Sequence, residues 1–187
     1  MSKVVGIIAE YNPFHNGHSY HIQNTKAQTG ADFVVAVMTG NFTQRGNTSV
    51  INKWEKAKMA LNGDADLVIE LPTIYSISSA ENFASGAVKI LNELGIVDTI
   101  SFGMEANDVS TLNNIANVLV NESPEYKTIL EHELGKGNSF PKARENALMM
   151  YLNDIKRYAN VVKGSNNILA IEYLKALKKQ KSSIVPF

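Results

Sequence analysis

Short apolar runs alternate along this chain with longer stretches in which hydrophobic residues recur every three or four positions. The apolar runs are typical of buried strands and lie at residues 4–8, 33–38, 67–71 and 96–102, with a fifth beginning at 182–187. The spaced stretches predict amphipathic helices at residues 18–28, 54–61, 79–94 and 168–178. This alternation predicts an α/β fold, a doubly wound Rossmann-like sheet of about five parallel strands with helices on both faces.

A second helical region lies between the fourth and fifth predicted strands. Helical spacing runs from Asp108 to Tyr158, Pro124 suits the start of a short helix that ends at residues 135–137, and Pro141 suits the first turn of another. We interpret residues 106–163 as a helical insertion in a single domain that spans residues 1–187. In the predicted helix 54–61, one face is expected to pack on the core through Trp54, Ala57 and Leu61.

Residues 4–18 organise the rest of the sequence, because they predict a buried strand, a tight turn and the start of a helix. Asn12-Pro13 ends the strand, since proline has no N–H for the sheet and restricts the residue before it. Asn16 is expected to be the N-cap of the helix. Gly17 has no Cβ, so a ligand can approach the backbone closely at this point.

Two histidines, His15 and His18, lie three residues apart at the predicted start of this helix. A helix N-terminus gathers unpaired N–H groups and a partial positive charge, which suits a phosphate group. Imidazoles at this place can donate to phosphate oxygens and stabilise charge that develops in phosphoryl or nucleotidyl transfer. The alternatives are a pair of surface histidines, or a zinc site that adds His21 and Glu10 although the chain contains no cysteine.

Further candidate residues follow the other predicted strands, at the edge where ligands bind in open α/β sheets. Arg45, in the polar loop after the second strand, suits a carboxylate or a phosphate, or else pins its own loop. Glu70 is either an exposed strand position or an inward carboxylate. Ser165 or Asn166 is expected to cap the last helix. We expect the site to lie between the loops at residues 15–18, 40–46, 103 and 165–167.

Composition adds limits rather than a function. Hydrophobic residues make up 44% and charged residues 19% of the 187 positions, an ordinary globular balance. Lys plus Arg and Asp plus Glu both total 18, so no basic excess indicates a nucleic-acid binder, although a local basic patch stays compatible with a neutral total. The absence of cysteine excludes disulfides and thiol catalysis. No apolar run spans a bilayer and no signal-peptide pattern begins the chain, so we expect a cytoplasmic protein without a membrane partner.

The stretch from Glu10 to His18 resembles the HxGH signature of the nucleotidyltransferase superfamily, which includes class I aminoacyl-tRNA synthetases and small adenylyltransferases. The full nine-residue sequence from Glu10 to His18 is more similar to one branch of this superfamily, the bacterial tRNA(Met) cytidine acetate ligase family. Five further stretches agree with that branch and extend the resemblance over nearly the whole chain: Met38–Gly46, Lys58–Leu61, Asp66–Pro72, Ser101–Gly103 and Ser165–Leu169.

The resemblance implies a two-step reaction. ATP, with Mg²⁺ on its phosphates, would activate acetate to acetyl-adenylate, which would then acetylate N4 of the wobble cytidine in elongator tRNA(Met). From the chemistry of their side chains we predict catalytic roles for His15, His18 and Arg45. The resemblance also implies that ATP contacts a set of residues in the signature and in two later loops: Ile8, Ala9, Glu10, Tyr11, Asn12, Pro13, Phe14, His15, Asn16, Gly17, His18, Ser19, Tyr20, His21, Gly103, Asn166 and Asn167. No metal site of the protein itself is expected, and the oligomeric state is left open.

The sequence departs from the family pattern in two ways. Members of the family are longer, with a following basic stretch that helps to bind ATP and later regions that help to hold tRNA. The chain also has no Lys-Met-Ser-Lys-Ser-like loop. We therefore expect a fragment or a shortened relative that lacks the C-terminal part of the family. The alternative functions are a small-molecule adenylyltransferase with phosphopantetheine or nicotinamide mononucleotide as acceptor, and a non-catalytic nucleotide sensor or RNA-binding module.

Overall fold

The computed structural model describes residues 2–105, 109–154, 158, 161 and 164–187. The chain divides into two compact units, Met1–Phe102 together with Gln180–Phe187, and Gly103–Lys179. The second unit contains the range 106–163 that the sequence assigns to an insertion, and it also includes the last helix. The single domain spanning residues 1–187 stays a prediction.

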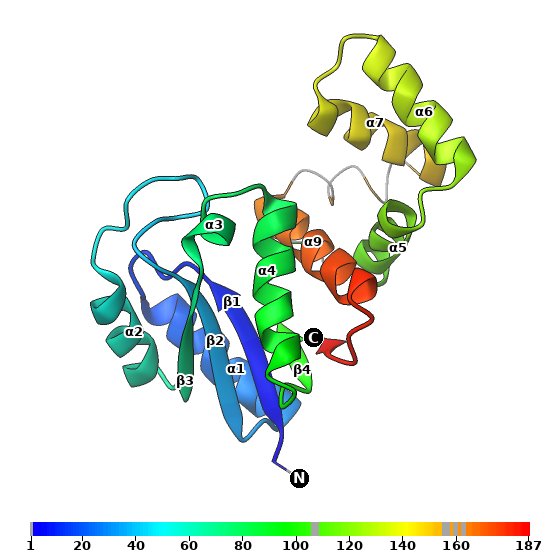
Figure 1. Cartoon of the computed structure of the whole chain (residues 1–187). Coiled ribbons are helices and arrows are strands. Elements are labelled where there is room, and N and C mark those ends of the chain that lie inside the picture. The colour runs from blue at the N-terminus through cyan, green and yellow to red at the C-terminus, as the bar shows by residue number, and fades with distance from the viewer. Residues whose placement is uncertain (1, 106–108, 155–157, 159–160, 162–163) are drawn as a thin grey trace. The chain divides into compact units, whose positions relative to one another are not determined.

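The first unit is built on a five-stranded parallel sheet with the order β3-β2-β1-β4-β5 (Figure 1). Its strands are β1 (Val4–Ala9), β2 (Phe33–Thr39), β3 (Leu67–Leu71), β4 (Thr99–Ser101) and β5 (Val185–Pro186). The chain passes from β1 outward to β3 and then crosses to β4 on the other side of β1. This confirms the predicted doubly wound sheet of about five parallel strands, with its switch point beside β1.

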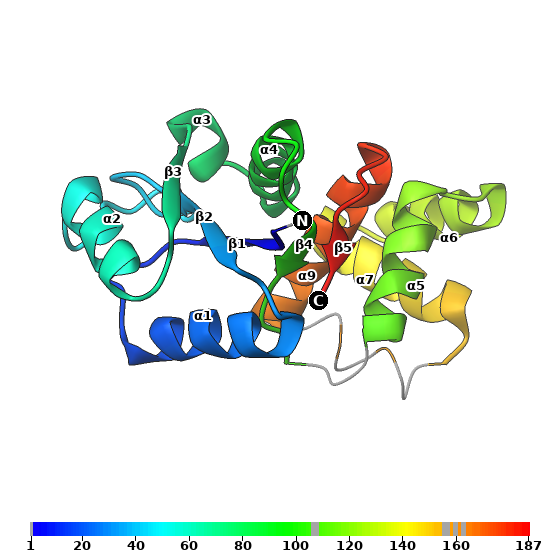
Figure 2. The ribbon, with the colours of Figure 1, turned by 90° about the horizontal axis from the view of Figure 1, so that it is seen from below.

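Helices lie on both faces of this sheet. They are α1 (Asn16–Thr29), α2 (Lys53–Asn62), the short α3 (Thr73–Ser76) and α4 (Ala80–Glu93). Figure 2 shows α1 below the strands and α4 above them. The Asn52 side chain caps α2 by accepting from two backbone N–H groups, and the Ser79 side chain caps α4 by accepting from one.

Alternate residues of the central strands point to opposite faces and meet different helices. One core cluster joins β1 and β2 to α1 and α2 through Val5, Ile7, Val34, Ala36, Met38, Ile22 and Ala60. On the opposite face, Gly6 lies against Leu91 of α4, and a Cβ at Gly6 would be only 2.7 Å from Leu91 Cδ1. The glycine therefore lets α4 approach the middle strand of the sheet.

The predicted buried face of α2 is confirmed for Ala57, which packs against the core cluster, and is wrong for its other two residues. Trp54 is 70% exposed and Leu61 is 46% exposed, whereas the buried positions are Lys56 and Ala60. A prediction from hydrophobic periodicity counts lysine as a polar residue and places its side chain in solvent. Here the lysine stem is buried and its ammonium finds oxygen acceptors, so the helix is rotated from the predicted orientation.

Two strands are shorter than the sequence predicts. β4 contains residues 99–101 rather than 96–102, because Ile96 follows the left-handed Gly95 (φ 66°) and is exposed. Asp98, also before the strand, accepts the Val4 N–H through its side chain at 2.8 Å. β5 contains residues 185–186 rather than 182–187, and it pairs in parallel with β4.

The second unit is helical. It contains α5 (Val109–Val120), α6 (Pro124–Gly135), α7 (Phe140–Leu152) and α9 (Ser165–Lys179). Within it α5 packs on α9 and α6 packs on α7. Pro124 and Pro141 lie in first helical turns as predicted, whereas Asp108, predicted to open the helical region, lies outside the described residues. No helix in the described ranges is long and apolar enough to cross a membrane.

Candidate active site

The turn between β1 and α1 brings the two signature histidines to the start of the helix. Tyr11 adopts a left-handed backbone (φ 48°), and the Asn12–Pro13 peptide bond is cis. The predicted N-cap, Asn16, is wrong, because Asn16 is already helical and His15 is the N-cap. The His15 Nδ1 atom accepts the Gly17 N–H at 3.1 Å, as a capping oxygen would.

His18 completes a reciprocal capping arrangement with His15. The His15 N–H donates to the His18 Nδ1 atom at 3.2 Å, and the two rings stack with centroids 3.7 Å apart and an interplanar angle of 21°. A Cβ at Gly17 would be 2.9 Å from the His15 ring, so glycine leaves room for this stack. Since both Nδ1 atoms accept backbone hydrogen bonds, each neutral imidazole carries its proton on Nε2.

His18 is held neutral by its surroundings. Its ring makes edge contact with Tyr11 and a tilted contact with Phe14, with centroids 4.8 and 5.5 Å apart. Burial, followed by the nearby His15 and His21, lowers the pKa of His18 to about 4. At neutral pH it is therefore a hydrogen-bond donor through Nε2–H and carries no charge.

His21 lies half-buried one turn further along α1, against the end of β4. Its Nε2 atom is 3.1 Å from Ser101 Oγ, which in turn is 2.8 Å from Thr25 Oγ1. Burial lowers the pKa of His21. The contact with β4 shows that the His21 ring is not fully exposed to solvent, and its role in ATP binding stays a prediction.

The signature is tied to the polar loop that follows β2. The Glu10 carboxylate accepts the Gln44 N–H at 2.6 Å, and the Asn12 side-chain oxygen accepts the Val50 N–H at 2.7 Å. Glu10 is thus occupied by the backbone of this loop rather than by a zinc-type cluster. Among the described residues, no group of three His, Cys, Asp or Glu side chains is placed to hold a metal ion.

Arg45 is exposed near the tip of the same loop. Within the described part of the chain its guanidinium has no ion-pair or hydrogen-bond partner, so the alternative in which Arg45 pins its own loop has no contact to support it. The loop is held by its backbone, through Thr43 N–H to Asn47 O and Gly46 N–H to Thr43 O, both at 2.9 Å. A catalytic role for Arg45 stays a prediction.

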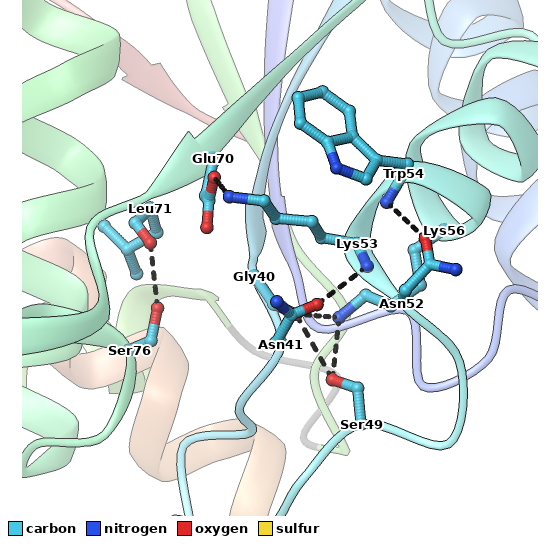
Figure 3. Close-up of polar contacts among 10 residues, drawn as sticks. All are labelled: Gly40, Asn41, Ser49, Asn52, Lys53, Trp54, Lys56, Glu70, Leu71 and Ser76. Carbon is cyan, nitrogen blue, oxygen red and sulfur yellow. Dashed lines mark hydrogen bonds and ion pairs between the residues drawn. The ribbon is translucent and has the colours of Figure 1, made fainter.

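A polar cluster that the sequence does not predict lies where β2 meets this loop (Figure 3). Lys56 is buried there, and Lys53 forms an ion pair with the exposed Glu70 at 2.6 Å. The Glu70 carboxylate also lies directly against Gly40, at a distance that leaves no space for a side chain. No motif marks these lysines, since α2 carries several lysines and its pattern does not distinguish the buried one.

The remaining predicted ligand residues belong to the second unit. Asn167 is buried, and its side-chain oxygen accepts the Glu105 N–H at 2.9 Å, which links the segment after Gly103 to α9. Gly103 is exposed, with no atom within 4 Å of the position of a Cβ. Helix α9 begins at Ser165, three residues before the predicted start, so Ser165 and Asn166 lie inside the helix rather than before it.

A family model described as HIGH Nucleotidyl Transferase matches residues 2–187. The chain belongs to this family. Its HxGH signature is the His15–His18 capping pair of α1, and the five-stranded parallel sheet is the Rossmann-like fold predicted for it. Membership in the HIGH nucleotidyl transferase family also confirms the resemblance that the signature suggests at the superfamily level.

Curated relatives identify the branch of the HIGH nucleotidyl transferase family. A protein of Acetivibrio thermocellus is 57% identical over 184 residues, which are 98% of this chain and 44% of that protein. A protein of Caldanaerobacter subterraneus subsp. tengcongensis is 54% identical over 99% of this chain and 46% of its own length. Both are named tRNA(Met) cytidine acetate ligase, which confirms the predicted branch. The chain spans slightly less than half the length of these relatives.

Solved structures agree with this placement. The crystal structure of Thermotoga maritima TmcAL bound with α-thio ATP matches with a TM-score of 0.93 and 42% identity over 98% of this chain and 45% of that one. The apo form of the same protein matches with a TM-score of 0.94. The similarity extends over both units of this member of the HIGH nucleotidyl transferase family.

Proposed function

We propose that this chain binds ATP at the start of α1 and uses it to activate acetate as acetyl-adenylate, the first step in the N4-acetylation of the wobble cytidine of elongator tRNA(Met). The observation that carries the proposal is the reciprocal capping of His15 and His18. Both Nδ1 atoms are held by backbone N–H groups, which leaves two Nε2–H donors at a helix N-terminus. The names of the relatives supply acetate and tRNA(Met) as the substrates.

In the first step an oxygen of acetate attacks the α-phosphorus of ATP, and the bond to the bridging oxygen of pyrophosphate breaks. Negative charge develops on the oxygens around the reacting phosphorus. His15 and His18 donate to these oxygens, and the positive end of α1 adds to their effect. A neutral His18 performs this role without the cost of keeping a buried charge when the site is empty.

Magnesium fits this site as a companion of the nucleotide. The described residues offer no cluster of three metal-ligating side chains, so ATP phosphates and water would supply most of its ligands. The ion would neutralise charge on the departing pyrophosphate. The residues of this chain then have the task of holding and orienting the α-phosphate.

In the second step the exocyclic amine of the cytidine attacks the acetyl carbon, AMP leaves with its oxygen, and the amine loses a proton. We place this step in the cytoplasm, where tRNA is found. ATP binding draws further support from the similarity to TmcAL, which was crystallised with α-thio ATP. The relatives are about twice as long as this chain, so the tRNA step is proposed for the complete enzyme.

The test is ATP–pyrophosphate exchange with acetate, propionate, glycine and no acid, beside a thermal titration with ATP. Exchange that requires acetate is expected. Stabilisation by ATP without exchange under any acid would favour a non-catalytic nucleotide-binding module. Formation of a dinucleotide from phosphopantetheine or nicotinamide mononucleotide would favour a small-molecule adenylyltransferase. Absence of both ATP stabilisation and exchange would contradict the assignment of the two histidines.

A further inference from the structure

Lys56 is a fully buried lysine on α2, and its ammonium lies at the carboxyl end of β2 (Figure 3). Its Nζ atom donates to Gly40 O at 2.9 Å, to Thr39 Oγ1 at 3.2 Å and to Ser49 Oγ at 3.2 Å. An ammonium group has three N–H bonds, so each of them has an acceptor. The group is therefore satisfied within the protein and leaves no donor for a ligand.

These three bonds close the base of the loop 40–49, the segment that leaves β2 and returns to α2. Thr39 is the last residue of β2, Gly40 is the first residue of the loop, and Ser49 lies at its other end. Ser49 Oγ also donates to Gly40 O at 3.2 Å, and Ser49 N–H donates to Asn41 O at 2.8 Å. Removing the ammonium would leave buried oxygen acceptors without their shared donor, which weakens the closure of the loop.

The same lysine is linked to the signature. Thr39 Oγ1 accepts from Lys56 and donates to the backbone oxygen of Glu10 at 3.3 Å. The Glu10 carboxylate in turn accepts the N–H of Gln44, next to Arg45. A continuous chain of hydrogen bonds therefore runs from Lys56 through Thr39 and Glu10 to the tip of the loop.

We propose that Lys56 is a positioning residue that sets the conformation of the loop 40–49 and thereby places Arg45 for the reaction, without touching a substrate itself. Among the described residues the Arg45 side chain has no hydrogen-bond or ion-pair partner, so the backbone of the loop determines where its guanidinium lies. The part of this inference that concerns catalysis rests on the proposed function. The part that concerns the loop rests on the contacts of Lys56 alone.

The restraint that Lys56 places on the loop is tested by the rate of trypsin cleavage between Arg45 and Gly46. Cleavage is carried out well below the melting temperature and followed by mass spectrometry. Lys56→Met should raise the rate at this bond about tenfold, because the loop opens more often. The matched control is Lys58→Met, the same substitution on the same helix at an exposed lysine that pairs with Glu55 on the surface. Equal cleavage rates in Lys56→Met and Lys58→Met would overturn the inference.

The link to Arg45 is tested by a double-mutant cycle in acetate-dependent ATP–pyrophosphate exchange. Lys56→Met should lower kcat/KM about 10²-fold in the natural background, because misplaced catalytic groups cost that much, but less than twofold in the Arg45→Ala background. An equal loss in both backgrounds would overturn the positioning role. If Lys56→Met does not fold, Ser49→Ala, which removes one acceptor at a half-buried position, should show the same pattern with a smaller loss.

Failure of the proposed function is distinguishable from failure of this inference. If the natural chain shows no exchange with acetate, the proposed function is contradicted. The double-mutant cycle is then repeated with the affinity for α-thio ATP as the measured quantity. The comparison of trypsin cleavage rates does not depend on the proposed function. Loss of affinity in Lys56→Met that disappears in the Arg45→Ala background would still support the positioning role, and additive losses would overturn it.

Discussion

The imidazole of His15 caps the start of α1, a role that serine or aspartate side chains fill in many other helices. It accepts a backbone N–H through Nδ1, while the backbone N–H of His15 is taken by His18. Each ring is therefore fixed by the main chain in one tautomer. Capping uses the Nδ1 atoms and leaves both Nε2 atoms for the phosphate recognition proposed above, so one pair of residues could serve both tasks.

Replacing His18 by alanine tests the catalytic half of this arrangement. We expect His18→Ala to lower the rate of ATP–pyrophosphate exchange about 10²–10³-fold, the usual cost of removing one donor to a developing oxyanion. The control is His132→Ala, which removes an exposed histidine of α6. Exchange that is equal in the two variants would show that His18 does not act on the reacting phosphate.

The lowered pKa of His18 predicts how stability depends on pH. The folded value is about 4 and the ordinary value is 6.5, so between them the unfolded chain binds a proton that the folded chain does not. The free energy of unfolding should therefore be unaffected above pH 6.5 and should fall as the pH drops toward 4. Urea unfolding across this range, with His18→Gln as comparison, is the measurement. If the free energy of unfolding depends on pH equally in His18→Gln and in the natural chain, the assignment of this dependence to His18 is contradicted.

Single residues were the least predictable part of the sequence. The pattern correctly indicates that His15 and His18 lie at a helix start, yet it assigns the cap to Asn16 because asparagine is the common choice. It gives no sign of Lys56, since burial of that lysine depends on oxygens from β2 and from a loop seven to seventeen residues away. Such tertiary contacts are not contained in local periodicity.

At the scale of elements, strands were predicted well where apolar runs have clear boundaries. Residues 67–71 were predicted without error, and 33–38 missed only Thr39, because Pro72 and the polar loop after Thr39 end these runs. The fourth strand was predicted too long, since Ile96 and Val97 are apolar but precede the paired residues. For α2 the position along the chain and the inward Ala57 were predicted correctly, whereas Trp54 and Leu61 were wrongly placed on the buried face.

The packing of α4 on β1 depends on one missing side chain. Gly6→Ala should destabilise the chain by about 1–3 kcal/mol, because its Cβ would press on Leu91, which must move in a filled core. The control is Gly135→Ala at the end of α6, where nothing lies within 4 Å of the new Cβ, and it should change stability by less than about 1 kcal/mol. Chemical unfolding of both variants provides the comparison, and equal effects would argue against close packing at Gly6.

At the scale of the whole molecule, both units bury apolar side chains, and the second also contains a buried group of charged residues. The first is organised by apolar contacts between the sheet and its helices. In the second, α7 is joined to α9 through Glu172, which is buried and pairs with Arg144 and Lys175, both at 2.7 Å. Because a buried charge is costly without its partner, this one carboxylate holds two cations in place.

Glu172→Gln should therefore loosen the second unit selectively. The variant removes the charge that Arg144 and Lys175 share, at an expected cost of about 3 kcal/mol or more, whereas Glu131→Gln on the exposed side of α6 should cost almost nothing. Hydrogen exchange measured by peptide should rise about 10²-fold in α9 while β1 and β2 keep their protection. Equal acceleration of exchange in α9 and in the strands β1 and β2 would mean that the two units unfold together. The two units defined by their contacts would then not be independent in stability.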